Sequence, residues 1–173
     1  YSVGPLVRDK DGISVAALVA ELAAFYKKRG MSLLQKLEQM YMEYGLYVSK
    51  QHSIAREGLE GSREIARIMS TLRDSPPSAI GELRVTEVAD YSTGQRRTAQ
   101  GAVQTIDLPR SNVLAFELSD GSRVMARPSG TEPKIKFYFD IRETMRKGES
   151  VSGARERADK KVYVLQDSVL RLF

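Results

Sequence analysis

Alternating apolar and polar residues in the second half of the chain restrict its fold more than any other feature. In residues 134–142 every second residue is apolar, which is the period of a strand with one buried face. That face would carry Ile135, Phe137, Phe139 and Ile141. Shorter strand-like runs occupy residues 83–91, 103–108, 112–118 and 122–126. A hairpin dipeptide, Asp120-Gly121, separates the last two runs, so the pattern predicts an antiparallel sheet.

Helical spacing is found first near the start of the chain. Residues 13–28 and 33–44 carry apolar side chains at intervals of three and four, which predicts two amphipathic helices. Asp9 and Asp11 are candidate N-caps for the first helix. Ser32 and Gln35 have the spacing of a capping box at the start of the second. We therefore expect a helical hairpin, which cannot bury both of its apolar stripes by itself.

Two further helices are predicted within the second half of the chain. Gly58 and Gly61 are expected to close the extended stretch before a helix at residues 62–73. A proline pair after that helix would end it, since proline cannot continue a helix. Ser152 is a candidate N-cap for the last helix. The polar residues 92–101 between strands read as a turn.

The order of these elements predicts an α+β fold. A strand at residues 46–56, a helix, four or five strands and a last helix favour an antiparallel sheet with helices packed on one face. We place a domain boundary near Lys50. Residues 1–50 would then be a helical hairpin from an incomplete α/β domain, and residues 51–173 would form the sheet domain.

Composition excludes several kinds of chemistry. The 173 residues include no cysteine and one histidine, so disulfides, thiol catalysis and a multi-histidine metal site are excluded. No run of 18 apolar residues is present and the first residues do not read as a signal peptide. We expect no membrane partner and a cytoplasmic location. The net charge of +5 comes from short basic clusters mixed with acidic residues, which usually indicates a solvated surface.

One turn between two predicted strands has the composition of an anion site. Its sequence is Arg127-Pro128-Ser129-Gly130-Thr131-Glu132-Pro133-Lys134. Glycine permits a positive φ and close approach of a ligand, and proline stiffens the turn. Backbone N–H groups, two hydroxyls, a guanidinium and an ammonium suit a phosphate. These residue types also occur in ordinary strand connections, so both interpretations stand at this point.

The same eight residues resemble the phosphate-binding loop in the C-terminal domain of the α-D-phosphohexomutases, the phosphoglucomutase/phosphomannomutase family. Residues 1–11 resemble the segment after the sugar-recognition loop in that family's third domain. The resemblance covers the whole chain and is least distinctive at residues 94–104. It implies a fragment with the end of domain 3 and all of domain 4, the latter a TATA-binding-protein-like β-α-β4-α domain.

Members of that family place four domains around one cleft and move a phosphoryl group between the 1- and 6-positions of a hexose. The resemblance implies a phosphoserine in the first domain, Mg²⁺ in the second, a sugar loop in the third and a hexose 1,6-bisphosphate intermediate. The fourth domain closes over the phosphate that is not being transferred. The implied partners are hexose phosphates and the missing upstream domains, and phosphoglucomutase is favoured over phosphomannomutase.

The resemblance assigns roles to individual residues. It implies that the phosphate ligands are Arg127, Ser129, Gly130, Thr131 and Lys134. Glu132 would be structural, because a carboxylate facing phosphate would repel it. Arg8 either reaches the cleft or interacts with Asp9 and Asp11 at the helix start. The family's phosphoserine and metal-loop strings do not occur, so we expect no catalytic residue, no metal ligand and no turnover from this chain alone.

Two other classes of function remain open from the residues. The basic composition and a curved sheet would suit a nucleic-acid-binding module, although stacking aromatics on a basic face are lacking. The apolar stripes of the helical hairpin would suit a non-catalytic protein-interaction module. The oligomeric state does not follow from the sequence.

Overall fold

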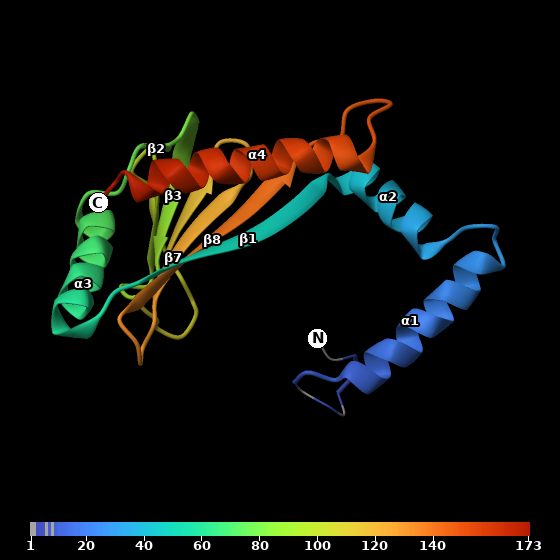
Figure 1. The fold of residues 1–173 in the computed structure, drawn as a ribbon, viewed down its shortest axis with the longest axis horizontal. Helices are drawn as coiled ribbons and strands as arrows, with labels where there is room; N and C mark the ends of the chain where they lie inside the picture. Colours follow the sequence, from blue (N-terminus) through green and yellow to red (C-terminus); the bar gives the residue numbers. More distant parts are fainter. Residues whose placement is uncertain (1–2, 6, 8) are drawn as a thin grey trace. The chain divides into compact units, whose positions relative to one another are not determined.

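The computed structural model describes residues 3–5, 7 and 9–173. The chain divides into two compact units, Tyr1–Gly45 and Leu46–Phe173. The division falls directly between helix α2 and strand β1 (Figure 1), so the whole of that strand belongs to the second unit. The assignment of residues 1–50 and 51–173 to family domains 3 and 4 stays a prediction.

The first unit is the expected helical hairpin. Helix α1 (Gly12–Lys27) begins where the Asp11 carboxylate accepts a hydrogen bond of 3.0 Å from the Ser14 N–H. Helix α2 (Leu33–Tyr44) begins with the complete capping box of Ser32 and Gln35. Of the two candidate caps of α1, Asp11 and not Asp9 is used, and the predicted capping box of α2 is confirmed. Within the described chain no residue of either helix is buried, and the exposed apolar side chains include Leu18, Leu22, Phe25, Leu37 and Met40.

The second unit is built on one antiparallel sheet, which confirms the predicted fold class. In the described chain its strands are β1 (Leu46–Ala55), β2 (Ala79–Ile80), β3 (Leu83–Asp90), β4 (Gln95–Thr98), β5 (Val103–Thr105), β6 (Leu114–Leu118), β7 (Arg123–Pro128) and β8 (Lys134–Glu143). The order is β1-β8-β7-β6-β3-β4-β5, with β2 paired to β3. Strand β1 pairs with β8 along its full length, from Leu46 opposite Glu143 to Ala55 opposite Lys134.

Helices α3 (Gly58–Asp74) and α4 (Val151–Leu170) cover one face of this sheet. Helix α4 packs on β8 and β1, as Figure 1 shows, and α3 contacts β8 and β7. Strand β8 alternates as predicted, because all four of its apolar residues are buried on this face. The helices complete the core with Ile65, Ile68, Met69 and Leu72 from α3 and Ala154, Ala158, Val162, Leu165 and Val169 from α4.

Several local predictions are wrong in detail. Helix α3 begins at Gly58, so Gly58 and Gly61 lie inside the helix and do not end the strand. Part of the predicted turn at residues 92–101 is strand β4, which pairs with β3. The Arg96 side chain of β4 forms an ion pair with Glu87 of β3. Helix α4 is capped by the Ser150 hydroxyl and not by Ser152, because the bonded N–H is that of Gly153.

Candidate functional site

The predicted anion loop, residues 127–134, includes the ends of two neighbouring strands and the connection between them, residues 129–133. It connects β7 to β8, which pair from Arg123 opposite Asp140 to Pro128 opposite Ile135. The loop is closed at its base by a hydrogen bond of 2.7 Å from the Ser129 N–H to the Lys134 carbonyl. A second bond, of 2.9 Å, runs from the Arg56 N–H to the Pro133 carbonyl. The sheet therefore holds both ends of the loop.

Cations gather at the base of this loop on the sheet face opposite the helices. Arg127 on β7 lies directly across from Lys136 on β8, and Lys136 lies across from Ser53 on β1. Lys134 is two residues before Lys136 and so shares its face. Like charges placed directly opposite each other destabilise a sheet. A pair of this kind is therefore better explained by an anionic ligand than by folding.

Carboxylates leave most of this positive charge unbalanced. Lys134 pairs with Glu132 at 3.8 Å. In the part of the chain that the structure describes, neither Arg127 nor Lys136 forms an ion pair. Arg127 is exposed and Lys136 is half-buried. The two side chains are thus available to a bound phosphate.

The tip of the loop offers hydroxyl and backbone groups. The Thr131 N–H lies 3.5 Å from the Ser129 Oγ, and both Gly130 and Thr131 are exposed. Gly130 does not use the positive φ that glycine permits, because it is not among the glycines in the left-handed region. A Cβ at Gly130 would meet nothing within 4 Å. The loop therefore has open space at this glycine, which leaves room for a ligand to approach the backbone.

A hollow separates the loop from helix α3. Its volume is about 330 Å³, and its walls include Ser62 and Met69 of α3, Asn112 before β6 and residues 128–133. The Asn112 Oδ1 accepts a hydrogen bond of 2.9 Å from Arg73, which also pairs with Asp90 at 3.1 Å. Because a guanidinium can only donate, this bond directs the Asn112 amide nitrogen away from Arg73.

Three of the six predicted site residues, Ser129, Gly130 and Thr131, line this hollow, whereas Arg127 and Lys134 lie at the adjoining strand ends and are not among its walls. The sixth, Arg8, lies outside the described residues, so its two proposed roles stay predictions. Lys136 was missed by the sequence reasoning, although its spacing of two from Lys134 places both on one strand face. Ser62 and Asn112 were also missed, and no sequence signal marks either of them.

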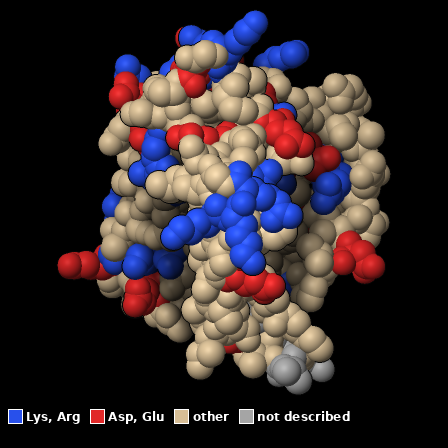
Figure 2. All heavy atoms as spheres, turned by 90° about the vertical axis from the view of Figure 1, so that its right-hand side faces the viewer, with Lys and Arg blue, Asp and Glu red and all other residues tan. Residues whose placement is uncertain are grey.

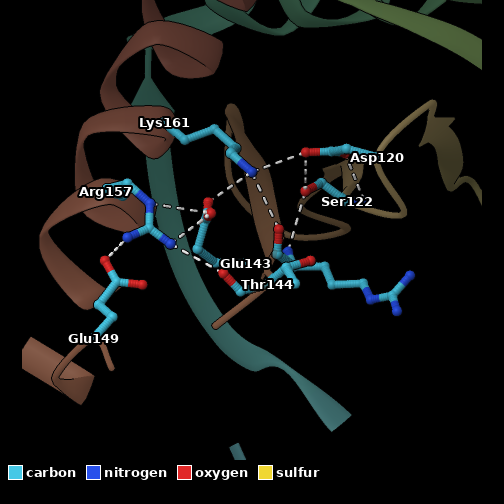
Figure 3. A network of polar contacts seen from close by, with 8 residues as sticks. Asp120, Ser122, Glu143, Thr144, Glu149, Arg157 and Lys161 are labelled. Carbon is cyan, nitrogen blue, oxygen red and sulfur yellow. Dashed lines mark hydrogen bonds and ion pairs between the residues drawn. The ribbon is translucent and has the colours of Figure 1, made fainter. Parts of the chain in front are cut away.

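Several other cations of the second unit are engaged in ion pairs with carboxylates. Figure 3 shows Lys161 of α4 reaching Asp120 and Glu143, each at 2.9 Å. Arg157, one turn earlier, bonds Glu143 at 3.1 Å and also pairs with Glu149. This network fastens α4 to the β6–β7 turn and to the end of β8. Its cations are therefore structural, in contrast to Arg127 and Lys136.

The same network shifts the pKa values of three of its side chains. Burial alone would raise the pKa of Asp120, but hydrogen bonds from Lys161 and Ser122 outweigh it and hold the pKa below its ordinary value. Burial is likewise outweighed at Glu143, whose pKa is lowered by Lys161 and Arg157. The pKa of Lys161 is raised despite burial, because Glu143 and Asp120 bond its ammonium form. All three groups are thus held in their charged forms.

Three further features of the described residues bear on function: their surface charge, their potential metal ligands and the apolarity of their helices. On the face that Figure 2 draws, groups of Lys and Arg side chains lie beside Asp and Glu, so charges of both signs are interspersed. Across the described residues, no group of three or more His, Cys, Asp or Glu could hold a metal ion. Nor is any helix of the described chain both long and apolar enough to cross a membrane.

Comparison with known proteins identifies relatives of the sheet domain that carries the loop. Residues 82–152, which contain it, match the phosphoglucomutase/phosphomannomutase C-terminal domain. The chain is 41% identical to a probable phosphomannomutase of Haemophilus influenzae over 82% of its own length and 26% of that protein. It is 37% identical to a phosphoglucomutase of Staphylococcus aureus, over 80% of the chain and 25% of that protein. The chain thus spans about a quarter of the length of these curated relatives.

A solved structure shares the fold. The open form of parafusin, a phosphoglucomutase from Paramecium described as an exocytosis-sensitive phosphoprotein, matches with a TM-score of 0.56. The match covers 95% of this chain and 28% of that protein, at 16% sequence identity, and so supports the fold alone. The sequence matches, and not this likeness of fold, show that this chain belongs to the phosphoglucomutase/phosphomannomutase family and that residues 82–152 match the family's C-terminal domain.

Proposed function

We propose that this chain is the substrate-phosphate-binding part of a phosphohexomutase that interconverts hexose 1-phosphate and hexose 6-phosphate. The observation that carries the proposal is the cationic couple of Arg127 and Lys136 at the base of the loop, which no carboxylate of the described chain neutralises. A pair of like charges that costs folding free energy is retained where a phosphate neutralises it. Family membership supplies the reaction class.

In the proposed reaction, the loop binds the phosphate that is not being transferred. Arg127 donates two parallel hydrogen bonds to phosphate oxygens, which the planar guanidinium favours. Lys134 and Lys136 add positive charge. Ser129, Thr131 and the Gly130 backbone donate the remaining hydrogen bonds. Each phosphate of a bisphosphorylated hexose would visit this loop in turn, so the loop orients the sugar in both half-reactions.

The chemical step is assigned to other parts of the protein. We propose that the nucleophilic phosphoserine and the Mg²⁺ site belong to other domains of the parent protein, because this chain spans about a quarter of the length of its curated relatives. On this view the parent protein is an isomerase of carbohydrate metabolism that works through a hexose 1,6-bisphosphate, and the chain alone has no turnover. A cytoplasmic location stays part of the proposal.

The preferred sugar is the least determined part of the function. Relatives of both kinds occur, a probable phosphomannomutase and a phosphoglucomutase, at similar identity. The residues around Arg8 favour a phosphoglucomutase, and we propose that preference. A loop that grips only phosphate would not distinguish the two sugars, so this chain should bind glucose and mannose phosphates with equal affinity.

A titration of the 173-residue chain tests the proposal. Glucose 6-phosphate, glucose 1-phosphate and mannose 6-phosphate should each shift the backbone amide signals of Gly130 and Thr131 in NMR spectra. Arg127→Ala should abolish the response. The matched control is Arg123→Ala, which lies on the same face of β7 but pairs with Glu117. An unchanged response in Arg127→Ala, or none in the unaltered chain, would refute the proposal.

Nucleic acid serves as the second arm of this titration. A duplex DNA of mixed sequence should leave the same signals unchanged at moderate salt. Tight DNA binding that weakens steeply as salt rises would instead favour a nucleic-acid-binding module.

A further inference from the structure

Helix α3 approaches the end of strand β1 so closely that only glycine fits at position 61. A Cβ on Gly61 would lie 2.5 Å from the Arg56 Cβ and 2.9 Å from the Arg56 carbonyl carbon. Gly61 is buried and does not occupy the left-handed region, so the requirement is space and not backbone conformation. The glycine therefore sets the distance between α3 and Arg56.

Arg56 in turn touches the phosphate loop through its backbone. Its N–H donates a hydrogen bond of 2.9 Å to the carbonyl of Pro133, the last loop residue before β8. Its side chain is held on α3, because the Nε donates to the Glu64 Oε1 at 2.9 Å. Arg56 is thus fixed to the helix on one side and to the loop on the other.

We propose that Gly61 and Arg56 are positioning residues for the phosphate loop. This inference rests on the proposed function, because it assigns these residues a role in phosphate binding. Neither residue needs to touch the ligand. Gly61 lets α3 seat Arg56, and the Arg56 N–H fixes the Pro133 carbonyl. That bond sets where Gly130 and Thr131 present their donors.

An alanine at position 61 would disturb the contact between α3 and Arg56. To reach an ordinary carbon–carbon contact, Arg56 and α3 would have to separate by about 1 Å. The same displacement would stretch the bond from the Arg56 N–H to Pro133. Because misplacement of binding groups by this distance is costly, Gly61→Ala should weaken glucose 6-phosphate binding by about 10- to 100-fold.

The test compares variants of the 173-residue chain, with glucose 6-phosphate as the probe and the Gly130 and Thr131 amides as reporters. Gly61→Ala should lose affinity. Leu72→Val trims the core of the same helix, where Leu72 is buried, but does not change the space beside Arg56, and so should retain affinity. Equal losses in both variants would mean that general loosening of α3 causes the effect, and would overturn the positioning role.

A double variant provides the specific rescue. Arg56→Gly removes the Cβ that an alanine at position 61 would strike, and it keeps the backbone N–H that bonds Pro133. The Arg56→Gly/Gly61→Ala variant should therefore bind more tightly than expected from the two single losses added together. The residual 2.9 Å approach to the backbone at position 56 makes the expected recovery partial. Strictly additive losses would count against the proposal.

A measurement on the unaltered chain does not depend on any variant folding. Its Arg56 amide should exchange slowly with deuterium and more slowly still with glucose 6-phosphate bound. Free exchange of this amide would overturn the positioning role even if Gly61→Ala fails to fold. If the unaltered chain does not respond to the probe, the proposed function fails as well. A normal response in both the unaltered chain and Gly61→Ala overturns the positioning role alone.

Discussion

Arg127 on β7 and Lys136 on β8 occupy directly opposed positions of the antiparallel ladder, with no carboxylate paired to either one in the described chain. Other cations of the second unit do have carboxylate partners. Lys161 bonds two carboxylates, and Arg123, on the same strand as Arg127, pairs with Glu117. Arg127 and Lys136 thus place two positive charges without carboxylate partners opposite each other at the base of the loop.

Removing Lys136 should separate stability from binding. Lys136→Ala relieves the repulsion with Arg127 and should raise the free energy of unfolding by about 0.2–1 kcal/mol. The same change should weaken glucose 6-phosphate binding, because a phosphate partner is lost. Urea denaturation and titration measure the two effects, with Lys136→Arg as the control that keeps the charge. A less stable Lys136→Ala variant would show that the pair is not strained.

Arg127→Ala should impair both directions of the reaction in the full-length enzyme. The loss of a charge-assisted, bidentate contact is expected to cost about 2–3 kcal/mol of phosphate interaction. Because each phosphate visits the loop, kcat/KM should fall by similar factors with glucose 1-phosphate and with glucose 6-phosphate. Steady-state kinetics in both directions measures the two losses, with Arg123→Ala as the control variant. A defect confined to one direction would place the anchor elsewhere.

The Asp120–Lys161–Glu143 network should make the second unit sensitive to acid. The folded-state pKa values of Asp120 and Glu143 lie below their ordinary values of 3.8 and 4.5. Their contribution to stability is therefore complete above those values and is lost as the pH falls through the lower, folded-state values. The pKa of Lys161 is raised above 10.5, so its contribution is complete below that pH and is lost only in more alkaline solution.

Urea midpoints across the acid range measure this effect. The unaltered chain should lose stability between about pH 5 and pH 2. Lys161→Met should be less stable at neutral pH, where it leaves two half-buried carboxylates without their ammonium partner. The variant should also lose less stability on acidification, because the pKa values of the two carboxylates are less depressed without Lys161. Parallel pH profiles for the two proteins would mean that the network does not govern acid stability.

Two serines near the start of α4, Ser150 and Ser152, should differ in their contribution to stability. Ser150→Ala removes the hydroxyl that accepts the Gly153 N–H at 3.1 Å, and should cost about 0.5–2 kcal/mol of stability. Ser152→Ala lies in an exposed position of the first turn and should change stability by less than about 0.5 kcal/mol. Denaturant midpoints of the two variants decide between them. A larger loss in Ser152→Ala would restore the cap expected from the sequence.

Patterns that repeat along the chain made much of this fold predictable. Strand β8 follows from its period of two, the β6–β7 turn from Asp120-Gly121, and the helix starts from Asp11 and Ser32. Strand β4 escaped prediction because its residues are polar. Its Arg96 is held by Glu87 on another strand, a partner that no local pattern reveals.

The loop was predictable as a string of residues, and its surroundings were not. Arg127 and Ser129 could be named because a single eight-residue segment carries the signal. Lys136 became a partner of Arg127 only through the register of β7 with β8. Gly61 was expected to end the extended stretch before α3, because its fit against Arg56 depends on the packing of a helix against a strand end. Tertiary contacts of this kind leave no trace in local sequence.

The complete pairing of β1 with β8 links the loop to the whole ladder. Ten consecutive pairs, from Leu46 to Ala55, precede the bond between Arg56 and Pro133. A slip of one residue would turn every side chain of β1 to the other face and move Arg56 out of reach of the Pro133 carbonyl. A chain that has paired these strands out of register would therefore lack its anion site, and phosphate binding would report correct folding across the full length of the sheet.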